Sequence, residues 1–389
     1  MKAIPVSDAE LFTDGSLSDP YPLYQELRDL GPVVELTAYG VYAFARYRQV
    51  REASGNWQVF SSAKGVMMND RINSALRGVT LCSDPPEHTR MRQVLGRPLG
   101  PEKLRELVPR IEDEAERLVA RLVEQGTFDA VTDLAEHLPL TVVSELVGLD
   151  DAGRAHMREW GSATFDAQGP VNQRTMDAFP KLDEMVAFAL HEAKPGTIKP
   201  DGWAAHLYAA AAQGDLPVEK CPFMMIDYIA PSLDTTIHAT SSAIHLFAHN
   251  PEQWDVLRAD PALVPHAINE VLRMESPVQR FTRYLTEDYD TEGCTLPAGS
   301  RVMLLYGAAN RDERRYLDPD RFDVRRKPSD HLAFGRGEHA CLGMNLARIE
   351  MRALLEALLP RVSRFELLAS ELELNNTLRG LGTCTVRVS

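Results

Sequence analysis

One ten-residue segment near the C-terminus combines residue types that could hold a metal ion through sulfur. The segment from Phe334 to Gly343 has the sequence F-G-R-G-E-H-A-C-L-G and stands directly before a helix that we expect to begin near Cys341. A thiolate at a helix N-terminus is stabilised by the helix dipole and by unpaired backbone N–H groups. Gly335 and Gly337 would let the backbone fold tightly beneath the sulfur. The arrangement suits an anionic sulfur ligand.

Two plainer interpretations of this segment compete with a metal ligand. Gly335-x-Gly337 is part of a dinucleotide-binding loop pattern, but the position that needs the third glycine holds Ala340. A lone cysteine is also more often a small buried apolar residue than a ligand. The missing third glycine excludes a dinucleotide-binding loop. Whether Cys341 is a ligand or a small buried apolar residue depends on the other motifs of the sequence.

The whole decapeptide resembles the haem-binding signature of the cytochrome P450 family, F-G-x-G-x-H-x-C-x-G, at every fixed position. The resemblance extends from Asp19-Pro20-Tyr21 to the C-terminal tail. It implies that Cys341 is the axial ligand of the iron of haem b and that Phe334 packs near the sulfur. A thiolate ligand pushes electron density toward the iron and favours O–O cleavage.

A second motif, His88-x-x-x-Arg92, follows Asp84-Pro85-Pro86, and Asp84 is a candidate cap for its helix. On the residues alone, a surface helix with scattered charge explains it equally well. The resemblance implies instead that both side chains bind haem propionates, together with Arg283 and His339. An arginine suits this role because its planar fork can bond both carboxylate oxygens.

Glu270-x-x-Arg273 places an acid and a base on one face of a predicted helix. Alone, such a pair is usually a solvated salt bridge. The resemblance implies a buried structural lock beneath the haem, completed by an arginine of the segment before the cysteine. We expect that arginine to be Arg321.

A long predicted helix over residues 217–249 contains the sequence Ala-Pro-Ser-Leu-Asp-Thr-Thr at 230–236. Pro231 cannot donate to the carbonyl of Asp227, so the helix must kink or open before Asp234. The resemblance implies that Thr235 hydrogen-bonds the oxygen substrate and that Asp234 relays protons. Pro231 and Ser232 replace the small residues that the family usually has there, which puts the geometry of the groove in doubt. A simple back-bond from Thr235 to the preceding turn is the alternative.

Residues 61–84 show no regular pattern, and we expect them to form a long loop. The resemblance places four segments around the substrate: this loop near residue 66, the central helices, the strand after Glu270 and Arg273, and the tail. The candidate contacts are Val66, Met67, Met68, Phe165, Ala230, Leu233, Val278, Gln279, Phe281 and Leu381. These residues are largely apolar, and no Arg or Lys is committed to an anionic substrate, with Arg379 left open. They favour a small neutral aromatic substrate that undergoes hydroxylation or O-demethylation.

Helical patterns must position most of these residues. Apolar spacing of three and four predicts helices over 19–30, 47–56, 101–123, 134–147, 151–166, 174–192, 261–274 and 341–359. β-prone segments are confined to a hairpin at 32–47, short strands at 280–286, 293–296 and 302–305, and a tail at 365–388. Strands at both ends with helices between them disfavour a doubly wound sheet. The expected fold is mainly α, the P450 fold, with a small β region in one domain of residues 1–389.

Composition excludes several other classes of protein. The 389 residues are 44% hydrophobic and 25% charged, as in ordinary globular proteins. The net charge of −14 disfavours nucleic acid or an anionic membrane as a partner. Five dispersed cysteines without a C-x-x-C pair make a disulfide framework or a zinc module improbable. With no signal-peptide pattern at the N-terminus, we expect a cytoplasmic protein that binds neither nucleic acid nor membrane.

The resemblance implies an oxidoreductase of the EC 1.14 type, a monooxygenase that inserts one oxygen atom of O2 into an organic molecule. We expect a monomer that receives electrons from a separate ferredoxin-type carrier with its own NAD(P)H reductase. An acidic carrier would need a basic patch, for which the candidates are Arg90, Arg97, Arg336, Arg348 and Arg352. A peroxygenase that uses hydrogen peroxide, and a haem-binding protein without turnover, are the alternatives.

Overall fold

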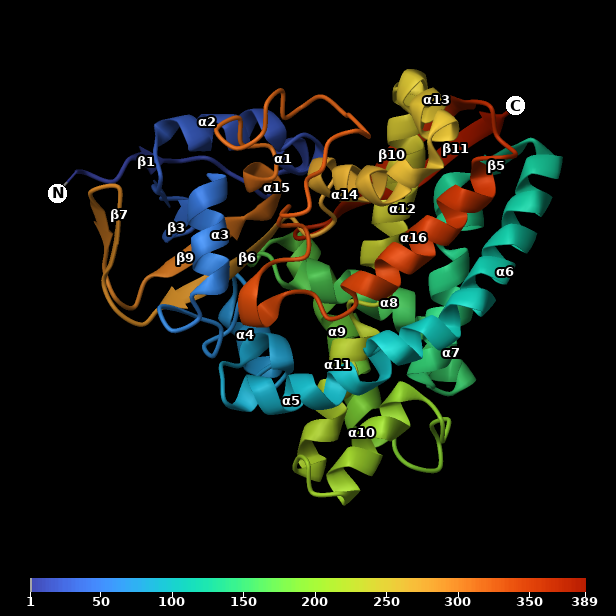
Figure 1. Cartoon of the computed structure of the whole chain (residues 1–389). Coiled ribbons are helices and arrows are strands. Elements are labelled where there is room, and N and C mark those ends of the chain that lie inside the picture. The colour runs from blue at the N-terminus through green and yellow to red at the C-terminus, as the bar shows by residue number, and fades with distance from the viewer. Residues whose placement is uncertain (1) are drawn as a thin grey trace.

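Helices form most of the molecule, and strands gather on one side of it and in a C-terminal hairpin (Figure 1). The structure is a computed structural model and describes residues 2–389. The helices are α1 (Asp14–Ser18), α2 (Tyr21–Leu30), α3 (Tyr47–Gly55), α4 (Asp70–Ala75), α5 (Glu87–Gly96), α6 (Pro101–Gln125), α7 (Ser144–Val147), α8 (Asp151–Ala167), α9 (Gln173–His191), α10 (Trp203–Ala212), α11 (Cys221–Ile229), α12 (Asp234–His249), α13 (Pro251–Ala259), α14 (Val264–Met274), α15 (Tyr306–Ala309) and α16 (Met344–Leu358).

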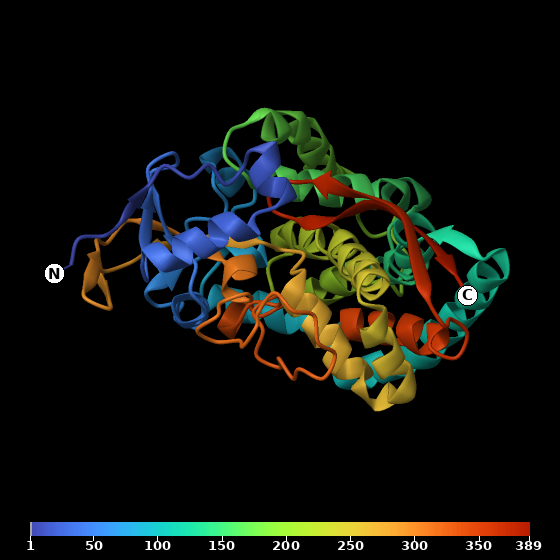
Figure 2. The same cartoon turned by 90° about the horizontal axis from the view of Figure 1, so that it is seen from above.

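The strands form three sheets. They are β1 (Val6–Ser7), β2 (Val34–Leu36), β3 (Val41–Phe44), β4 (Phe60–Ser61), β5 (Thr127–Asp129), β6 (Arg280–Leu285), β7 (Tyr289–Thr291), β8 (Cys294–Leu296), β9 (Arg301–Leu305), β10 (Phe365–Leu374) and β11 (Arg379–Val388). Six strands pair in the order β1-β2-β3-β9-β6-β4, three as β10-β11-β5, and two as β7-β8. The six-stranded sheet lies near the N-terminus, and the β10–β11 hairpin crosses the helical part (Figure 2).

The fold class that the sequence predicts is confirmed: the molecule is mainly α with small sheets. The amphipathic segments predicted at 101–123, 151–166 and 174–192 are α6, α8 and α9, and the predicted hairpin at 32–47 is the antiparallel pair β2–β3. Local periodicity was sufficient there because each helix buries one face against the core.

Three predictions about elements are wrong. The helix predicted over 217–249 is two helices, α11 and α12, separated at residues 230–233. The helix predicted over 134–147 consists of two short π-helical segments, at Ala130–Ala135 and Pro139–Val143, followed by α7. The loop predicted over 61–84 contains α4, whose N-terminus is capped by the Asn69 side chain.

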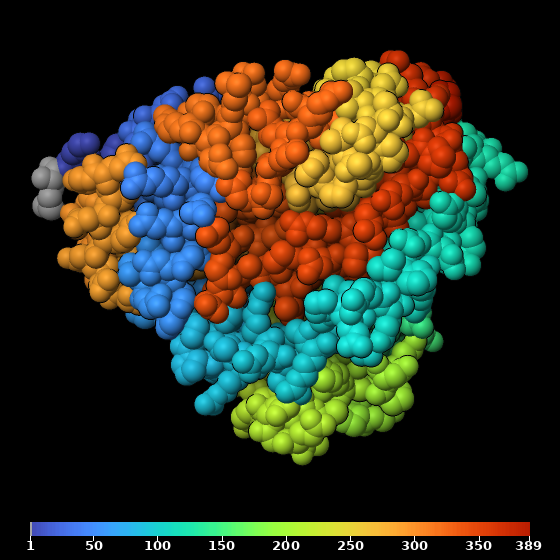
Figure 3. Space-filling model, viewed as in Figure 1, coloured from blue at the N-terminus to red at the C-terminus, as the bar shows by residue number. Residues whose placement is uncertain are grey.

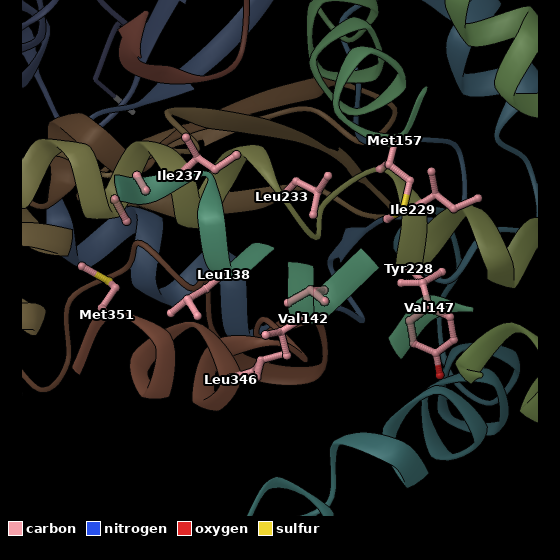
Figure 4. Close-up of a cluster of buried hydrophobic side chains, with 14 of the residues drawn as sticks. Leu138, Val142, Val147, Met157, Tyr228, Ile229, Leu233, Ile237, Leu346 and Met351 are labelled. Carbon is pink, nitrogen blue, oxygen red and sulfur yellow. The ribbon is translucent and has the colours of Figure 1, made fainter. Parts of the chain in front are cut away.

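The largest hydrophobic core lies between α12, α16 and the helices from α6 to α11. Figure 4 shows Ile229, Leu233 and Met157 meeting on one side of this cluster, and Leu346 with Leu138 on the other. α6 and α16 pack along each other, and Figure 3 shows α16 at the surface between the α5–α6 segment and the α13–α14 segment. This core fixes the helices on which the candidate site is built.

None of the helices within residues 2–389 is both long and apolar enough to cross a bilayer.

Candidate active site

A large cavity lies in the interior between the α11–α12 segment, α5, β6 and the loop that carries Cys341. It encloses about 1580 Å³ of empty space, counting its opening to solvent. Its lining comes from residues between Met67 and Met351 and is largely apolar, as is usual for a site that binds a small molecule or cofactor.

The Cys341 loop folds back on itself at one wall of this cavity. Gly335 and Gly337 have φ angles of 63° and 72°, which residues with a Cβ rarely adopt. The backbone N–H of Cys341 donates to the carbonyl of Phe334 over 2.8 Å, closing the loop. α16 begins at Met344, three residues later than predicted, so the sulfur lies just before the helix.

Backbone donors and cations surround the Cys341 sulfur. The N–H groups of Gly343 and Met344, and the positive charges of Arg92 and Arg348, lower the pKa of the thiol. Burial outweighs them, so the pKa of Cys341 is raised above its ordinary value. The helix terminus alone does not supply a thiolate; a metal ion at the sulfur would deprotonate it outright.

Buried nitrogen atoms without partners face the same cavity. His88 Nδ1 and Nε2 and His339 Nε2 have no hydrogen-bond partner among residues 2–389, although their rings lie 4.3 Å apart. Burial lowers the pKa of both histidines, that of His339 to about 2. Arg92 donates to the carbonyl of Ala340, and Arg283 Nη1 donates to that of Thr282 over 2.8 Å.

These residues fit a haem. A porphyrin with two carboxylates would supply the acceptors that the unpartnered imidazoles lack, and two arginines in the lining would balance its charge. Phe334 lines the cavity beside the sulfur, with the Arg348 guanidinium 4.7 Å from the centre of its ring. The structure thus brings together the six residues for which the sequence predicted cofactor contacts: His88, Arg92, Arg283, Phe334, His339 and Cys341.

Another part of the cavity wall is formed where the central helix breaks. α11 ends at Ile229, Pro231 has no N–H to continue the ladder, and α12 starts at Asp234. The Ser232 hydroxyl donates to the carbonyl of Tyr228 and closes the break from the other side. The break exposes Ala230, Pro231 and Thr235 to the cavity.

Asp234 is buried at the first turn of α12 and is linked to the surface by charged side chains. Its Oδ1 lies 3.8 Å from Nε of Arg158, and its Oδ2 has no hydrogen-bond partner among the described residues. Arg158 also contacts Glu136 and, over 3.9 Å, the partly exposed Glu373. Burial, followed by the negative charge of Glu373, raises the pKa of Asp234 to about 8. The carboxyl group therefore holds a proton at neutral pH.

Thr235 lies in the cavity wall beside this acid. Its hydroxyl donates to the carbonyl of Pro231 over 3.0 Å, as the alternative interpretation of the sequence expected. A hydroxyl that donates to the preceding turn still has lone pairs that can accept a hydrogen bond from the cavity side. The back-bond thus orients Thr235 without excluding it from chemistry.

The predicted lock beneath the site is present, with one correction. Glu270 and Arg273 are fully buried and joined by two hydrogen bonds of 2.7 and 2.8 Å. The third member is Arg326, whose Nε donates to Glu270 Oε1 over 3.0 Å, and not Arg321. Arg321 is exposed because it belongs to a surface turn after Asp318, and Arg326 donates to the carbonyls of that turn.

A second correction concerns Asp84. Its side chain accepts hydrogen bonds from the Ser61 hydroxyl and from the N–H of Ser62, and it does not cap α5.

Half of the predicted substrate contacts line the cavity. Met67, Phe165, Ala230, Val278 and Phe281 do so, whereas Val66, Met68, Leu233, Gln279 and Leu381 do not.

Each of the five excluded residues has another place in the fold. Val66 and Met68 line a separate small pocket. Leu233 packs on Ile229 and Met157 in the core (Figure 4), and Leu381 packs in the same core. Gln279 donates to the carbonyl of Ser276 over 2.6 Å and accepts from Tyr24, so its amide is used structurally.

Arg379, left open as a contact for an anionic substrate, lies outside the cavity lining and is paired with Glu275 over 2.9 Å.

Several residues of the lining were not predicted from the sequence. Residues of the segment before α5 and of α8 reach the cavity: Leu76, Val79, Thr80, Leu81, Thr164 and Gln168. Irregular backbone gave no periodicity from which the first four could be placed. Asp227, an acid in an otherwise apolar stretch, also lines the cavity, and its type was the available signal.

Comparisons with known proteins agree with this geometry. A family profile described as "Cytochrome P450" matches residues 174–382. The chain is 35% identical over 377 residues to cytochrome p450 CYP199A2 of Rhodopseudomonas palustris, covering 96% of this chain and 92% of that protein. It is 32% identical to the cytochrome P450 monooxygenase PikC of Streptomyces venezuelae, covering 98% and 94% respectively.

Solved structures share the fold over nearly the whole chain. CYP109E1 of Bacillus megaterium, in complex with testosterone, is similar with a TM-score of 0.85 and 26% identity, covering 96% of this chain and 99% of that one. CalO2 is similar with a TM-score of 0.83 and 27% identity, covering 98% of both chains.

Proposed function

The chain belongs to the cytochrome P450 family of monooxygenases, and from this premise we propose that it binds haem b through Cys341 and oxidises a small, largely apolar, aromatic molecule. One oxygen atom of O2 enters the substrate, by hydroxylation or O-demethylation, and the other leaves as water with two electrons and two protons. We propose a monomer of one domain, residues 1–389, that takes its electrons from a ferredoxin-type carrier with a separate NAD(P)H reductase.

One observation carries this proposal: Cys341 and unpartnered histidines line the same cavity as Thr235, which directly follows the buried acid Asp234 at the start of α12. When bound, the haem supplies the iron at which O2 is activated. The protein supplies the rest. His88, Arg92, Arg283 and His339 would hold the haem carboxylates, and the apolar lining excludes water around the substrate.

Proton delivery is the proposed role of Asp234 and Thr235. Asp234 holds a proton at its carboxyl group near neutral pH, and Arg158 with Glu373 connects it toward solvent. The Thr235 oxygen, fixed by its bond to Pro231, can accept a hydrogen bond from a water inside the cavity, through which the proton of Asp234 would be passed on to the reacting oxygen.

We expect Thr235→Ala and Asp234→Asn each to lower O2-dependent substrate oxidation about 100-fold, because a positioned proton donor contributes about 10² to 10⁴ in rate. Peroxide-supported oxidation should survive, since hydrogen peroxide carries both protons already. Because Asp234 loses its proton as pH rises through about 8, the wild-type O2-dependent rate should fall there, and the Asp234→Asn rate should not. Product formation against pH measures both.

Thr236→Ala is the matched control, because the neighbouring threonine also lines the cavity but is not proposed to bind the water that passes on the proton. If Thr235→Ala kept full activity while peroxide alone supported turnover in the wild type, the protein would be a peroxygenase. If neither oxidant produced any product with reconstituted carriers, it would be a haem-binding protein without turnover.

The proposed carrier would meet the surface near the Cys341 loop. Among the candidate arginines, Arg97 pairs with Asp215 over 2.6 Å and Arg352 lies near Glu112 and Glu356, so their charges are already balanced. Arg90 and Arg336 are exposed and have no ion pair among residues 2–389. These two form the strongest attraction for an acidic protein.

Charge reversal at Arg90 and Arg336 should therefore raise the carrier concentration needed for half-maximal turnover about tenfold at low salt, with less effect at high salt. Arg364→Glu, an exposed arginine beside the C-terminus, is the control. Steady-state turnover against carrier concentration measures the effect. Equal behaviour of the double variant and the control would refute docking at this surface.

A further inference from the structure

The cavity contains one carboxylate that the proposed chemistry does not use. Asp227 lies on the cavity side of α11 together with Ile226, while Tyr228 and Ile229 point into the hydrophobic core (Figure 4). It is the one Asp or Glu among the residues of the described chain that line the cavity. Ala230 and Pro231, one turn later, continue the same wall toward Thr235.

The carboxylate of Asp227 is held in place but not neutralised. Its Oδ2 accepts a hydrogen bond of 2.9 Å from the backbone N–H of Thr80, which fixes the side chain against the segment before α5. Within residues 2–389 no Lys, Arg or His lies within salt-bridge distance of it. A charged group enclosed by protein without a partner of opposite charge is costly.

The positively charged side chain that acts on Asp227, that of Arg92, has other binding partners. Burial raises the pKa of Asp227 to about 6, although hydrogen bonds from Thr80 and from the N–H of Leu81, and to a smaller extent the charge of Arg92, act in the opposite direction. Arg92 is bonded to the carbonyl of Ala340 and is a proposed partner of a haem carboxylate. Asp227 therefore stays negatively charged at neutral pH and keeps the capacity to bind a cation.

A second acceptor without a partner faces the same space. Gln168, the residue that follows the last turn of α8, is 5% exposed and lines the cavity, and its Oε1 accepts no hydrogen bond from the described residues. The Thr164 hydroxyl, by contrast, is satisfied by the carbonyl of Trp160 over 2.7 Å. Phe165 and Phe281 add aromatic faces to the lining, and such faces attract cations. Asp227 and Gln168 can thus accept a hydrogen bond from a donor or contact a cation.

We propose that Asp227 is a specificity-determining residue that binds a cationic nitrogen of the substrate. The substrate class is then a small aromatic molecule that carries an ammonium group, rather than a neutral aromatic. This inference rests on the proposed function, because it concerns the substrate of the same cavity.

A purely structural role for Asp227 is the competing explanation. The hydrogen bond from Thr80 could serve only to attach the segment before α5 to α11. Asp227→Asn separates the two roles, because an amide oxygen still accepts from the N–H of Thr80 while the negative charge is lost.

The test compares two ligands of the same shape in the haem-loaded enzyme. One is 4-phenylbutyl-trimethylammonium, and the other is its neutral analogue with a tert-butyl group in place of the cation. A quaternary ammonium has no lone pair and cannot ligate iron, so calorimetry reports only binding in the cavity. We expect the wild type to bind the cation about 10- to 100-fold more tightly, the range of a contact with a charged group.

Asp227→Asn should reduce this preference to less than about twofold and leave the affinity for the neutral ligand unchanged. Asp166→Asn is the matched control, because burial also raises the pKa of Asp166 to about 6 but the residue does not line the cavity. This control should keep the preference of the wild type.

Two outcomes would overturn the inference: equal binding of both ligands by the wild type, or an equal loss of affinity for both ligands in Asp227→Asn. The second would assign Asp227 to the attachment of the loop. The spectrum of the reduced, CO-treated protein separates these outcomes from a failure of the proposed function. A wild type without the strongly red-shifted Soret band would refute haem–thiolate binding itself, whatever the ligand preference.

Discussion

Cys341→Ala is expected to remove the strongly red-shifted Soret band of the reduced, CO-treated protein and to lower O2-dependent oxidation below detection. The sulfur is the one side chain of the Phe334–Gly343 loop that can give the iron a thiolate ligand, and a neutral or imidazole ligand does not supply the same electron push. Absorption spectroscopy and product analysis with reconstituted carriers measure the two effects. Cys341→His should retain haem but not the shifted band.

Cys294→Ala and Cys384→Ala are the controls for this prediction. Both cysteines are free and buried, and neither lines the cavity. Each substitution removes one buried sulfur and should cost only the stability of a small core truncation, about 1 kcal/mol. A shifted band that persisted in Cys341→Ala, or that disappeared in a control, would disprove the assignment of Cys341 as the ligand.

We expect a large effect of Cys341→Ala because bonds within the protein itself hold the loop that carries the sulfur. The bond from its N–H to Phe334, the glycine conformations at Gly335 and Gly337, and the N–H groups of Gly343 and Met344 fix the sulfur at the cavity wall. Burial raises the pKa of the free thiol, so we do not expect this loop alone to generate a thiolate. The protein would position the sulfur, and a bound metal would complete its ionisation.

Local sequence predicted what depends on local geometry. The Cys341 loop, the His88–Arg92 pair and the Glu270–Arg273 pair each depend on spacing within one loop or one helix, and the structure places each of them as the spacing requires. The break at Pro231 follows from a missing N–H in the same way, although its extent, a complete separation of α11 from α12, did not.

Residues that depend on tertiary packing were predicted less well. Leu233 lies beside the break, where an altered backbone turns it into the core instead of the cavity. Gln279 was expected in the cavity from its place before β6, but Tyr24, far away in sequence, binds its amide. Asp227 was visible as an acid within an apolar stretch, yet only the fold shows that its carboxylate faces the cavity.

The arginine that joins the buried Glu270–Arg273 pair was also predicted incorrectly, because its identity depends on tertiary packing. The difference between the two candidates can be measured. Arg321 and Arg326 lie five residues apart, and composition does not distinguish them. In the structure, Arg326 bonds Glu270 and the carbonyls of Leu317 and Asp318, so it closes the turn to which Arg321 belongs. We therefore expect Arg326→Ala to lower the free energy of unfolding more than Arg321→Ala does.

Arg273→Ala is expected to cost about 3–5 kcal/mol of unfolding free energy, because it leaves the Glu270 carboxylate buried without its main partner. It also removes hydrogen bonds of 2.8 and 2.7 Å to the carbonyls of Asn310 and Pro319. Arg326→Ala should cost less, about 1–3 kcal/mol, because Arg326 is partly exposed and Arg273 still pairs with Glu270. Urea unfolding followed by circular dichroism measures both values.

Arg321→Ala is the matched control for the lock, and its exposed side chain should contribute less than about 0.5 kcal/mol. If Arg273→Ala does not fold, the comparison of Arg326→Ala with Arg321→Ala still decides the question. A loss in Arg321→Ala equal to or larger than that in Arg326→Ala would mean that the buried carboxylate is balanced by the earlier arginine. The segment between Asp318 and the Cys341 loop would then follow a path different from that in the structure.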